Sequence, residues 1–169
     1  LAIGDIVTDA FIKLIDNQAY VTENDQGKWL TMQFGTKLPF DHAEVLEGVG
    51  NASNAAVSAS RLGLKTSFVT NVGDDKEGLS MIRALQKEKI DTSLVRVNAR
   101  KVSNMHYVLW YKEERTILIN HENYKYYWPH LRPDEIPRWV YFSSISENAL
   151  EYHDQVSDWL DKHPDVKLA

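Results

Sequence analysis

The sequence predicts an α/β protein with a parallel sheet, and two observations support this fold class. Strand and helix patterns alternate: an apolar run at 1–8 is followed by a helix ending near residue 62, a strand at 66–72 and a helix at 76–89. The segment 66–72 is also mostly apolar, as is typical of parallel strands that are buried on both faces.

The charge and the cysteine content of the chain exclude several classes of protein. The chain has 169 residues, the size of one domain, a net charge of −5 and a pI near 5.7, which argue against nucleic acid or a membrane surface as a partner. It has no cysteine, which excludes disulfides, thiolate nucleophiles and cysteine-bound metals. No leader peptide and no apolar run near the ~20 residues of a membrane span is evident, so the cytoplasm is the expected compartment.

The first strand is expected to continue from residues 1–8 to Ile15, and a second is expected at 31–35, after a polar loop that includes 24–27. Apolar segments at both ends, the last at 166–169, lead us to expect a sequence that is cut at both ends.

A glycine-rich turn at 48–54 opens the first helix, and Gly63 follows it as a residue suited to a left-handed conformation. Small side chains dominate this helix, so we expect it to pack closely against parallel strands. They are Ala52, Ser53, Ala55, Ala56, Ser58, Ala59 and Ser60.

The next helix is expected at 76–89, after the turn Gly73–Asp75. An aspartate of this turn is the expected N-cap. Helical spacing predicts a core stripe of Leu79, Ile82 and Leu85.

The pattern then changes to a hairpin. Strands are expected at 104–111 and 116–120, joined by the polar segment Lys112–Arg115. A hairpin inserted in a strand–helix series usually belongs to a separate antiparallel sheet, so we expect a lid.

The last part returns to the strand–helix pattern, with a strand at 141–145, a helix at 147–162 and a strand at 166–169. The expected core stripe of this helix and the expected core anchors of the preceding loop are Leu150, Val156, Trp159, Leu160, Tyr126, Tyr127 and Trp128.

Most catalytic signatures are absent. The six histidines have no ligand spacing, so we expect no metal site. The densest constellation is 48–63: Gly48 and Gly50 allow close backbone approach, and the Asn54 amide can bind hydroxyls or phosphate. A purely structural turn, or a dinucleotide site lacking its third glycine, are the alternatives.

The segments Gly50–Asn54, Arg61–Gly63, Val69–Gly78 and Gly4–Asp9 together resemble the first signature of the ribokinase-like (PfkB) carbohydrate kinases. The resemblance covers the whole chain. It implies a ribokinase-like fold: a partial parallel sheet flanked by helices, with a small β lid formed by segments at about 11–40 and 100–122.

The resemblance also implies substrate-binding residues. Asp9 matches the family's acceptor for sugar hydroxyls, and Gly50 and Asn54 match the turn and the amide that hold the sugar. Asn51 is a weaker candidate, and Glu122 matches a family glutamate near the pocket, with a plain surface residue as the alternative.

Asn104, His106 and Trp110 alternate along one expected lid strand and so share a face. They could close over a sugar. Packing or a homodimer through the lid explains the aromatic residues equally well.

Two positions depart from the family pattern. Val49 replaces the first glycine of the usual pair, and Val7 stands where ribokinases have asparagine, which argues against ribose itself. Asp74 and Asp75 are expected to be structural, as caps of the following helix.

The implied activity is ATP-dependent phosphoryl transfer, with Mg²⁺, to a hydroxyl of a sugar or related polyol. The family's catalytic aspartate lies in a Gly-Ala-Gly-Asp type of motif, and no Gly-x-Gly-Asp occurs here. We therefore expect an N-terminal part of such a kinase, without catalytic residues, without the C-terminal nucleotide-binding half, without tight binding of ATP and inactive alone. A nucleoside kinase of the same fold and a non-catalytic sugar-binding or interaction module are the alternatives.

Overall fold

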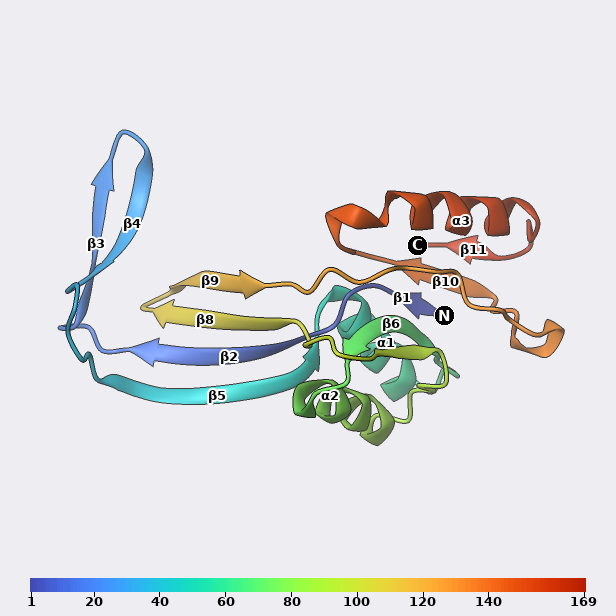
Figure 1. The fold of residues 1–169 in the computed structure, drawn as a ribbon, viewed down its shortest axis with the longest axis horizontal. Helices are drawn as coiled ribbons and strands as arrows, with labels where there is room; N and C mark the ends of the chain where they lie inside the picture. The colour runs from blue at the N-terminus through green and yellow to red at the C-terminus, as the bar shows by residue number, and fades with distance from the viewer. The chain divides into compact units, whose positions relative to one another are not determined.

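The computed structural model describes all residues 1–169, and these form two compact units. Unit 1 comprises residues 1–8, 47–104 and 121–169, and unit 2 comprises residues 9–46 and 105–120. Each unit has its own sheet (Figure 1).

Unit 1 is built on a five-stranded sheet with the strand order β11-β10-β1-β6-β7. All of its neighbouring strands pair in parallel, which confirms the predicted sheet type. The strands are β1 (Ala2–Ile3), β6 (Phe68–Gly73), β7 (Val95–Asn98), β10 (Trp139–Phe142) and β11 (Lys167–Leu168).

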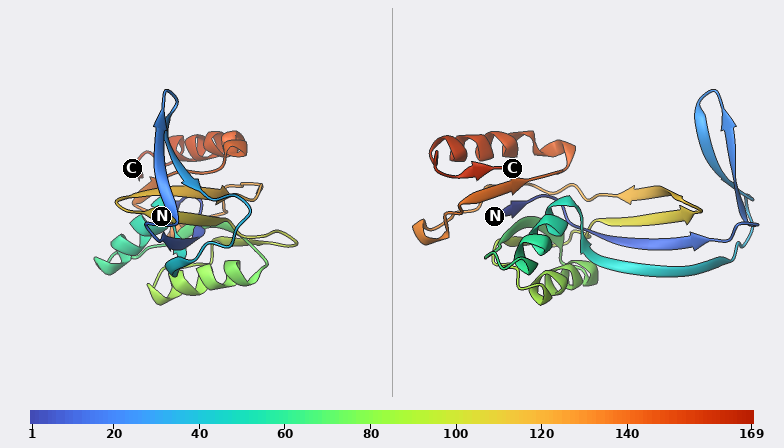
Figure 2. Two further views of the ribbon diagram at one scale, coloured as in Figure 1. Left: turned by 90° about the vertical axis from the view of Figure 1, so that its left-hand side faces the viewer. Right: turned by 180° about the vertical axis from the view of Figure 1, so that it is seen from behind.

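Helices cover both faces of this sheet. Helices α1 and α2 lie on one face and α3 lies on the other, as Figures 1 and 2 show. Side chains of β6 alternate between the two resulting cores: Phe68 packs on the α1 and α2 side, and Val69 packs on the α3 side. The helices are α1 (Asn51–Arg61), α2 (Lys76–Lys87) and α3 (Leu150–Asp161), with short 3₁₀ turns at Pro133–Glu135 and Glu147–Ala149.

The small side chains of α1 allow the close packing that the sequence predicts. A Cβ atom added to Gly4 would lie 2.7 Å from the Cβ atom of Ala52, closer than two such carbons approach. Ala52, Ser53 and Ala56 are buried in this contact region, and Gly63 has the predicted left-handed conformation, with φ of 89°.

The predicted core position is wrong for two leucines. Leu79 is 48% exposed, because the buried side of α2 runs through Gly78, Met81 and Leu85 and Leu79 falls beside it. Gly78 sets this orientation, since its backbone packs against the carbonyl oxygen of Gly73.

The other is Leu150, which is 74% exposed. The buried stripe of α3 begins instead at Tyr152 and continues at Val156. The prediction for Trp159 and Leu160 is confirmed, since both pack against the same core.

Unit 2 contains a four-stranded sheet with the order β5-β2-β8-β9, here called the lid sheet, and a separate two-stranded hairpin, β3–β4. The β8–β9 pair is antiparallel, with Val108 opposite Ile117, as predicted. The strands are β2 (Val7–Leu14), β3 (Ala19–Asn24), β4 (Gly27–Met32), β5 (Phe40–Val49), β8 (Met105–Tyr111) and β9 (Glu114–Asn120).

Several predicted strands are corrected. The first predicted strand is broken at residues 4–6, so that β1 belongs to the parallel sheet and β2 to the lid sheet. The strand expected at 31–35 is instead β4, which ends at Met32, and the loop expected around 24–27 is the tight turn between β3 and β4. Strands β3, β5 and β7 have no counterpart in the prediction, and β10 starts two residues before the predicted strand.

Candidate substrate-binding site

Gly50 is the N-cap of α1 and occupies a backbone conformation that only glycine adopts readily, with φ of 131° and ψ of 169°. A Cβ atom at this position would lie 2.9 Å from the carbonyl oxygen of Asp5. No side chain caps α1, so its first backbone N–H groups face outward with the positive end of the helix dipole. Such a turn suits hydroxyl or anionic groups.

The two predicted asparagines lie on the first turn of α1 and are exposed. The Asn51 amide donates a hydrogen bond of 3.2 Å to the hydroxyl oxygen of Ser144, which follows β10. The Asn54 backbone carbonyl oxygen accepts one of 2.8 Å from the Ser58 hydroxyl, and this bond within α1 does not involve the exposed side-chain amide of Asn54. Asn51 is thus held in place within unit 1, whereas Asn54 is presented to solvent.

Val49 departs from the family's glycine pair without backbone strain. The left-handed position in this turn is Gly48, with φ of 74°, while Val49 is not among the non-glycine residues with positive φ. A Cβ atom on Gly48 would also meet the Cβ atom of Ala84 at 3.3 Å. The turn therefore needs glycine at 48 and 50, and a branched residue fits between them.

Asp9 and His106 are in contact in unit 2, and they form an ion pair when the imidazole is protonated. The Nδ1 atom of His106 lies 3.0 Å from the Oδ1 atom of Asp9, and the side chains are 17% and 22% exposed. Asp9 is on β2 and His106 is on β8, which are neighbours in the lid sheet. A fixed, partly buried carboxylate of this kind can accept hydrogen bonds from sugar hydroxyls.

Glu122 takes part in a structural network of unit 1. Its Oε1 atom accepts hydrogen bonds from the Lys101 ammonium group at 2.8 Å and from the backbone N–H of Asn123 at 2.9 Å. The bond from Lys101 is the largest effect on Glu122 and lowers the pKa of its carboxyl group. The Glu122 backbone N–H donates a hydrogen bond of 2.9 Å to the Asn104 side chain, and a role of Glu122 in binding substrate stays a prediction.

The expected face of Asn104, His106 and Trp110 is only partly correct. His106 and Trp110 lie on β8, four residues apart and so on one face of the strand. Asn104 precedes the strand, is buried and donates a hydrogen bond of 3.2 Å to the carbonyl oxygen of Ile6. The Asn104 amide therefore bonds to the backbone within unit 1, and Asn104 does not share the face of β8 that His106 and Trp110 occupy.

Trp110 is engaged within unit 2. The Lys13 ammonium group lies 3.9 Å from the centre of its ring, and its indole N–H donates to the Lys112 carbonyl oxygen at 2.7 Å.

Asp5 and Tyr126 form a contact that the sequence interpretation missed. The Tyr126 hydroxyl donates a hydrogen bond of 2.7 Å to the Asp5 carboxylate. Burial raises the pKa of Asp5, and this outweighs the Tyr126 hydrogen bond, which lowers it. Burial, with the charge of Asp5, also raises the pKa of the Tyr126 phenol. The signal was present: Asp5 is the second residue after the parallel strand β1, at the sheet edge where ligands bind in α/β folds.

The aspartates after β6 are structural, as predicted. The Asp75 carboxylate caps α2 by accepting from the Gly78 N–H at 2.9 Å, and it also accepts from the Ser103 N–H at 2.7 Å. Asp74 accepts from the Arg100 N–H at 2.8 Å.

The predicted site residues thus fall into separate groups in the structure. In unit 1, Gly50 and Asn51 lie together with Asp5 and Ser144. In unit 2, Asp9 lies with His106. Glu122 forms its own pair with Lys101, and no group of three histidine or carboxylate side chains is arranged to hold a metal ion.

Comparison with known proteins agrees with this architecture. Residues 43–153 match the model of the pfkB family carbohydrate kinases. A ribokinase of Haemophilus influenzae is 34% identical over 59 residues, which are 35% of this chain and 19% of that protein.

Two solved structures show the same fold. Ribokinase from Cryptococcus neoformans in complex with ADP has a TM-score of 0.58 and 16% identity, covering 83% of this chain and 38% of that one. A nucleoside kinase of Methanocaldococcus jannaschii has a TM-score of 0.58 and 16% identity, covering 85% and 43%. The chain therefore spans less than half the length of these proteins. Because the family model matches well over half of its residues, the chain belongs to the pfkB family of carbohydrate kinases.

Proposed function

We propose that this chain provides the sugar-binding part and the lid of a kinase that transfers the γ-phosphoryl group of ATP to a hydroxyl of a sugar or a sugar-derived polyol. The observation that carries this proposal is the Asp9–His106 pair, because it holds a partly exposed carboxylate in one orientation. A carboxylate with two oxygens can accept hydrogen bonds from two neighbouring hydroxyl groups, which is the chemistry that a polyol offers.

The other proposed substrate-binding residues supply complementary groups. Gly50 lets the backbone N–H groups of α1 approach the ligand, and Asn54 offers an exposed amide. Asn51 and Glu122 are assigned positioning roles, since the first is bonded to Ser144 and the second to Lys101. His106 orients Asp9.

We also propose that this chain alone does not bind ATP and Mg²⁺ tightly. Phosphoryl transfer needs a base for the attacking hydroxyl and charges that offset those of the phosphates. The chain has no Gly-x-Gly-Asp segment and no cluster of carboxylates suited to a metal ion. The ADP complex of the Cryptococcus ribokinase supports an adenine nucleotide as the donor for the complete kinase. We propose that the 169-residue chain alone binds substrate without phosphorylating it.

Calorimetric titration with fructose, ribose, 2-keto-3-deoxygluconate and adenosine, without nucleotide, tests the proposal. We expect one sugar to bind. Asp9→Asn should weaken its binding about tenfold or more, because a hydrogen bond to a charged group is lost. Asp41→Asn is the matched control, because Asp41 also pairs with a histidine, His42, but in an exposed position.

Three results would contradict parts of the proposal. Equal affinity of the Asp9→Asn variant would refute the role of Asp9. Binding of adenosine alone would favour a nucleoside kinase, which the similarity to the Methanocaldococcus enzyme makes a necessary comparison. Sugar phosphate formed from ATP by the chain alone would contradict the proposed lack of activity.

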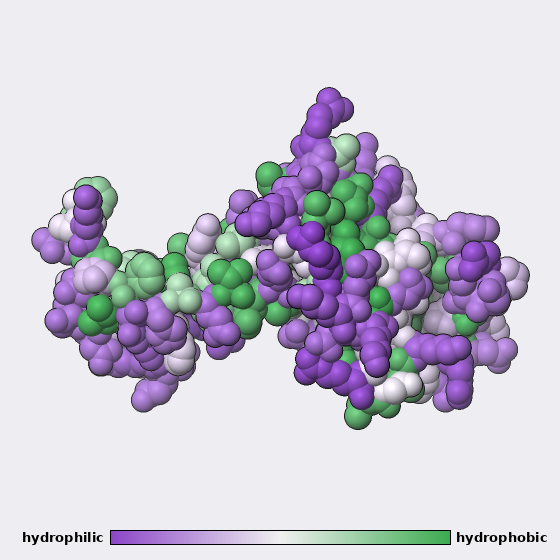
Figure 3. All heavy atoms as spheres, turned by 90° about the horizontal axis from the view of Figure 1, so that it is seen from below, coloured by the Kyte–Doolittle hydropathy of each residue, from purple (hydrophilic) through white to green (hydrophobic).

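We also propose a homodimer through the lid sheet. Apolar side chains of this sheet are exposed, and Figure 3 shows hydrophobic residues among hydrophilic ones over the surface of unit 2. They include Val45, Leu46, Trp110, Ile117, Leu118 and Ile119. Light scattering should give the mass of a dimer for the chain and that of a monomer for Ile119→Lys; a monomer in both cases would refute this proposal.

None of the helices in the structure has the length and the apolar character that a membrane-spanning helix needs.

A further inference from the structure

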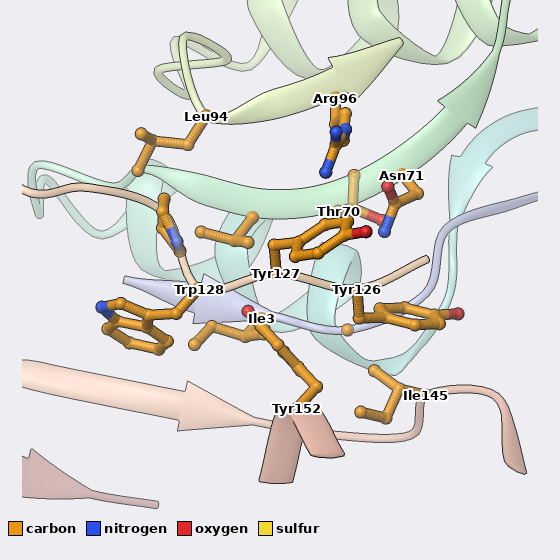
Figure 4. Close-up of a pocket in the computed structure, with 13 residues that line it drawn as sticks. Ile3, Thr70, Asn71, Leu94, Arg96, Tyr126, Tyr127, Trp128, Ile145 and Tyr152 are labelled. Atoms are coloured by element: carbon orange, nitrogen blue, oxygen red, sulfur yellow. The ribbon is translucent and has the colours of Figure 1, made fainter. Parts of the chain in front are cut away.

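A cavity of about 180 Å³ lies within unit 1, on the side of the parallel sheet that α3 covers (Figure 4). Its apolar floor includes Ile3, Val69 and Ile145, and its walls include Tyr127, Trp128 and Tyr152. A cavity of about 150 Å³ lined by apolar side chains can hold benzene, so this volume suits a single aromatic ring.

The walls of this cavity are fixed by hydrogen bonds. The Trp128 backbone N–H donates to the Gln155 side chain at 2.8 Å, and the Asn148 amide donates to the Tyr124 carbonyl oxygen at 2.7 Å. The hydroxyl of Tyr126, between these two anchors, binds Asp5. Three hydrogen bonds therefore hold the segment 124–128 against the rest of unit 1, and the cavity is formed before any ligand binds.

The charge of the lining favours an anion. Arg96 is its one charged residue, and no carboxylate is present among the side chains that form the cavity. The Arg96 guanidinium lies 4.7 Å from the centre of the Tyr127 ring, and Tyr127 is 52% exposed, which corrects its predicted role as a core anchor. The two side chains form a rim at which a carboxylate could bind the planar guanidinium with two hydrogen bonds.

Two buried polar groups of the lining have no partner. The Tyr152 hydroxyl and the Trp128 indole N–H are both inaccessible to solvent and make no hydrogen bond. Tyr152 is 2% exposed, and in Figure 4 its side chain rises from α3 toward β1 and the Tyr127–Trp128 segment. Because a water-sized probe does not reach these two atoms, a ligand in the cavity would contact the aromatic rings that carry them and not the hydroxyl or the N–H group itself.

We propose that this cavity binds a small aromatic acid. Its ring would lie between the apolar floor and the aromatic walls, and its anionic group would bind Arg96. This site is formed by residues other than those proposed to bind the sugar, so it is independent of the proposed function.

Binding is measured by calorimetry and by the quenching of tryptophan fluorescence, with the 169-residue chain and four probes. Benzoate and phenyl phosphate carry a ring and an anionic group, benzyl alcohol carries the ring alone and acetate the charge alone. We expect benzoate or phenyl phosphate to bind at least tenfold more tightly than benzyl alcohol and acetate; whichever of the two binds more tightly identifies the anionic group. Equal binding of benzyl alcohol and the two anions, or no binding of any aromatic probe, would overturn the proposal.

Two variants locate the ligand. Arg96→Gln should weaken binding of the aromatic anion about tenfold and change that of benzyl alcohol less than twofold. Arg138→Gln is the matched control, because Arg138 is an exposed arginine of unit 1 that does not line the cavity. Equal effects of the two variants would overturn the assignment of Arg96.

Discussion

The Nδ1 atom of His106 lies 3.0 Å from the Oδ1 atom of Asp9, across two neighbouring strands of the lid sheet. Both side chains are largely buried, so the imidazole restricts the carboxylate to one orientation. Asp9 belongs to β2 and His106 to β8, which are far apart in the sequence. The strand pairing therefore brings together two residues that the sequence suggested for separate reasons.

Replacement of His106 should affect sugar binding through Asp9. His106→Phe removes the partner of the carboxylate and should weaken binding about tenfold, whereas His106→Gln, whose amide can still donate a hydrogen bond, should restore part of it. Calorimetry with the sugar that the chain binds measures both effects. His42→Gln is the control, since His42 pairs with Asp41 in an exposed position; a loss in this control as large as in His106→Phe would contradict the assignment.

Gly50 should tolerate alanine poorly. The φ of 131° and the Cβ position 2.9 Å from the Asp5 carbonyl oxygen predict a loss of about 2–4 kcal/mol in the free energy of unfolding for Gly50→Ala. Gly63→Ala is the matched control. Its φ is also positive, at 89°, but nothing lies near an added Cβ atom, so about 1 kcal/mol is expected. Urea denaturation gives both values, and equal losses would show that the close contact has no effect.

Asp75 should make the fold less stable in acid. Burial alone would raise the pKa of its carboxyl group, but hydrogen bonds from Ser103 and Gly78 outweigh burial and lower it. A lowered pKa means that the charged form stabilises the fold above the unfolded-state pKa of 3.8, and that this stability is lost as the pH falls through the folded-state value.

Asp75→Ala should therefore reduce the free energy of unfolding by about 2 kcal/mol at pH 6, and the difference from the unmodified chain should shrink toward pH 3. Denaturation curves across this range measure it. Asp25→Ala, at the exposed turn of the β3–β4 hairpin, should have a small effect throughout. A difference for Asp75→Ala that stays constant with pH would contradict the lowered pKa.

Asp5 should have the opposite pH dependence. Because burial raises its pKa, its contribution to stability is present below the unfolded-state pKa and is lost as the pH rises through the folded-state value. The free energies of unfolding of the Asp5→Asn variant and of the unmodified chain should therefore be compared at pH 4 and at pH 7. The variant should gain stability over the unmodified chain as the pH rises from 4 to 7.

The Tyr126 hydroxyl counteracts the effect of burial on Asp5. Tyr126→Phe removes this donor and should raise the pKa of Asp5 further, as a ¹³C NMR titration of the carboxyl carbon would show. Tyr127→Phe is the control, since no hydrogen bond of the Tyr127 hydroxyl to Asp5 exists. An unchanged titration in Tyr126→Phe would contradict the role of this hydrogen bond.

Local chemistry explains which elements the sequence could predict. Helices α1 and α2 were found because a glycine turn and the Asp75 cap mark their starts, and β6 because it is apolar. The strands that were missed have no such marks. In β5, eight of the ten residues are exposed, so the strand has no apolar alternation, and β7 is short and half-exposed.

The candidate site divides in the same way. The sequence alone determined the turn at Gly50, the asparagines beside it and the family to which the motif belongs, because these features depend on local backbone geometry and on residue types at fixed spacing. Only the tertiary structure decided that Asp9 contacts His106, that Tyr126 binds Asp5, that Glu122 is held by Lys101, and that a cavity forms beside Arg96. Each of these contacts joins residues that are distant along the chain, and their pairing follows from strand order and from the packing of a coil segment on a sheet, which no local pattern encodes.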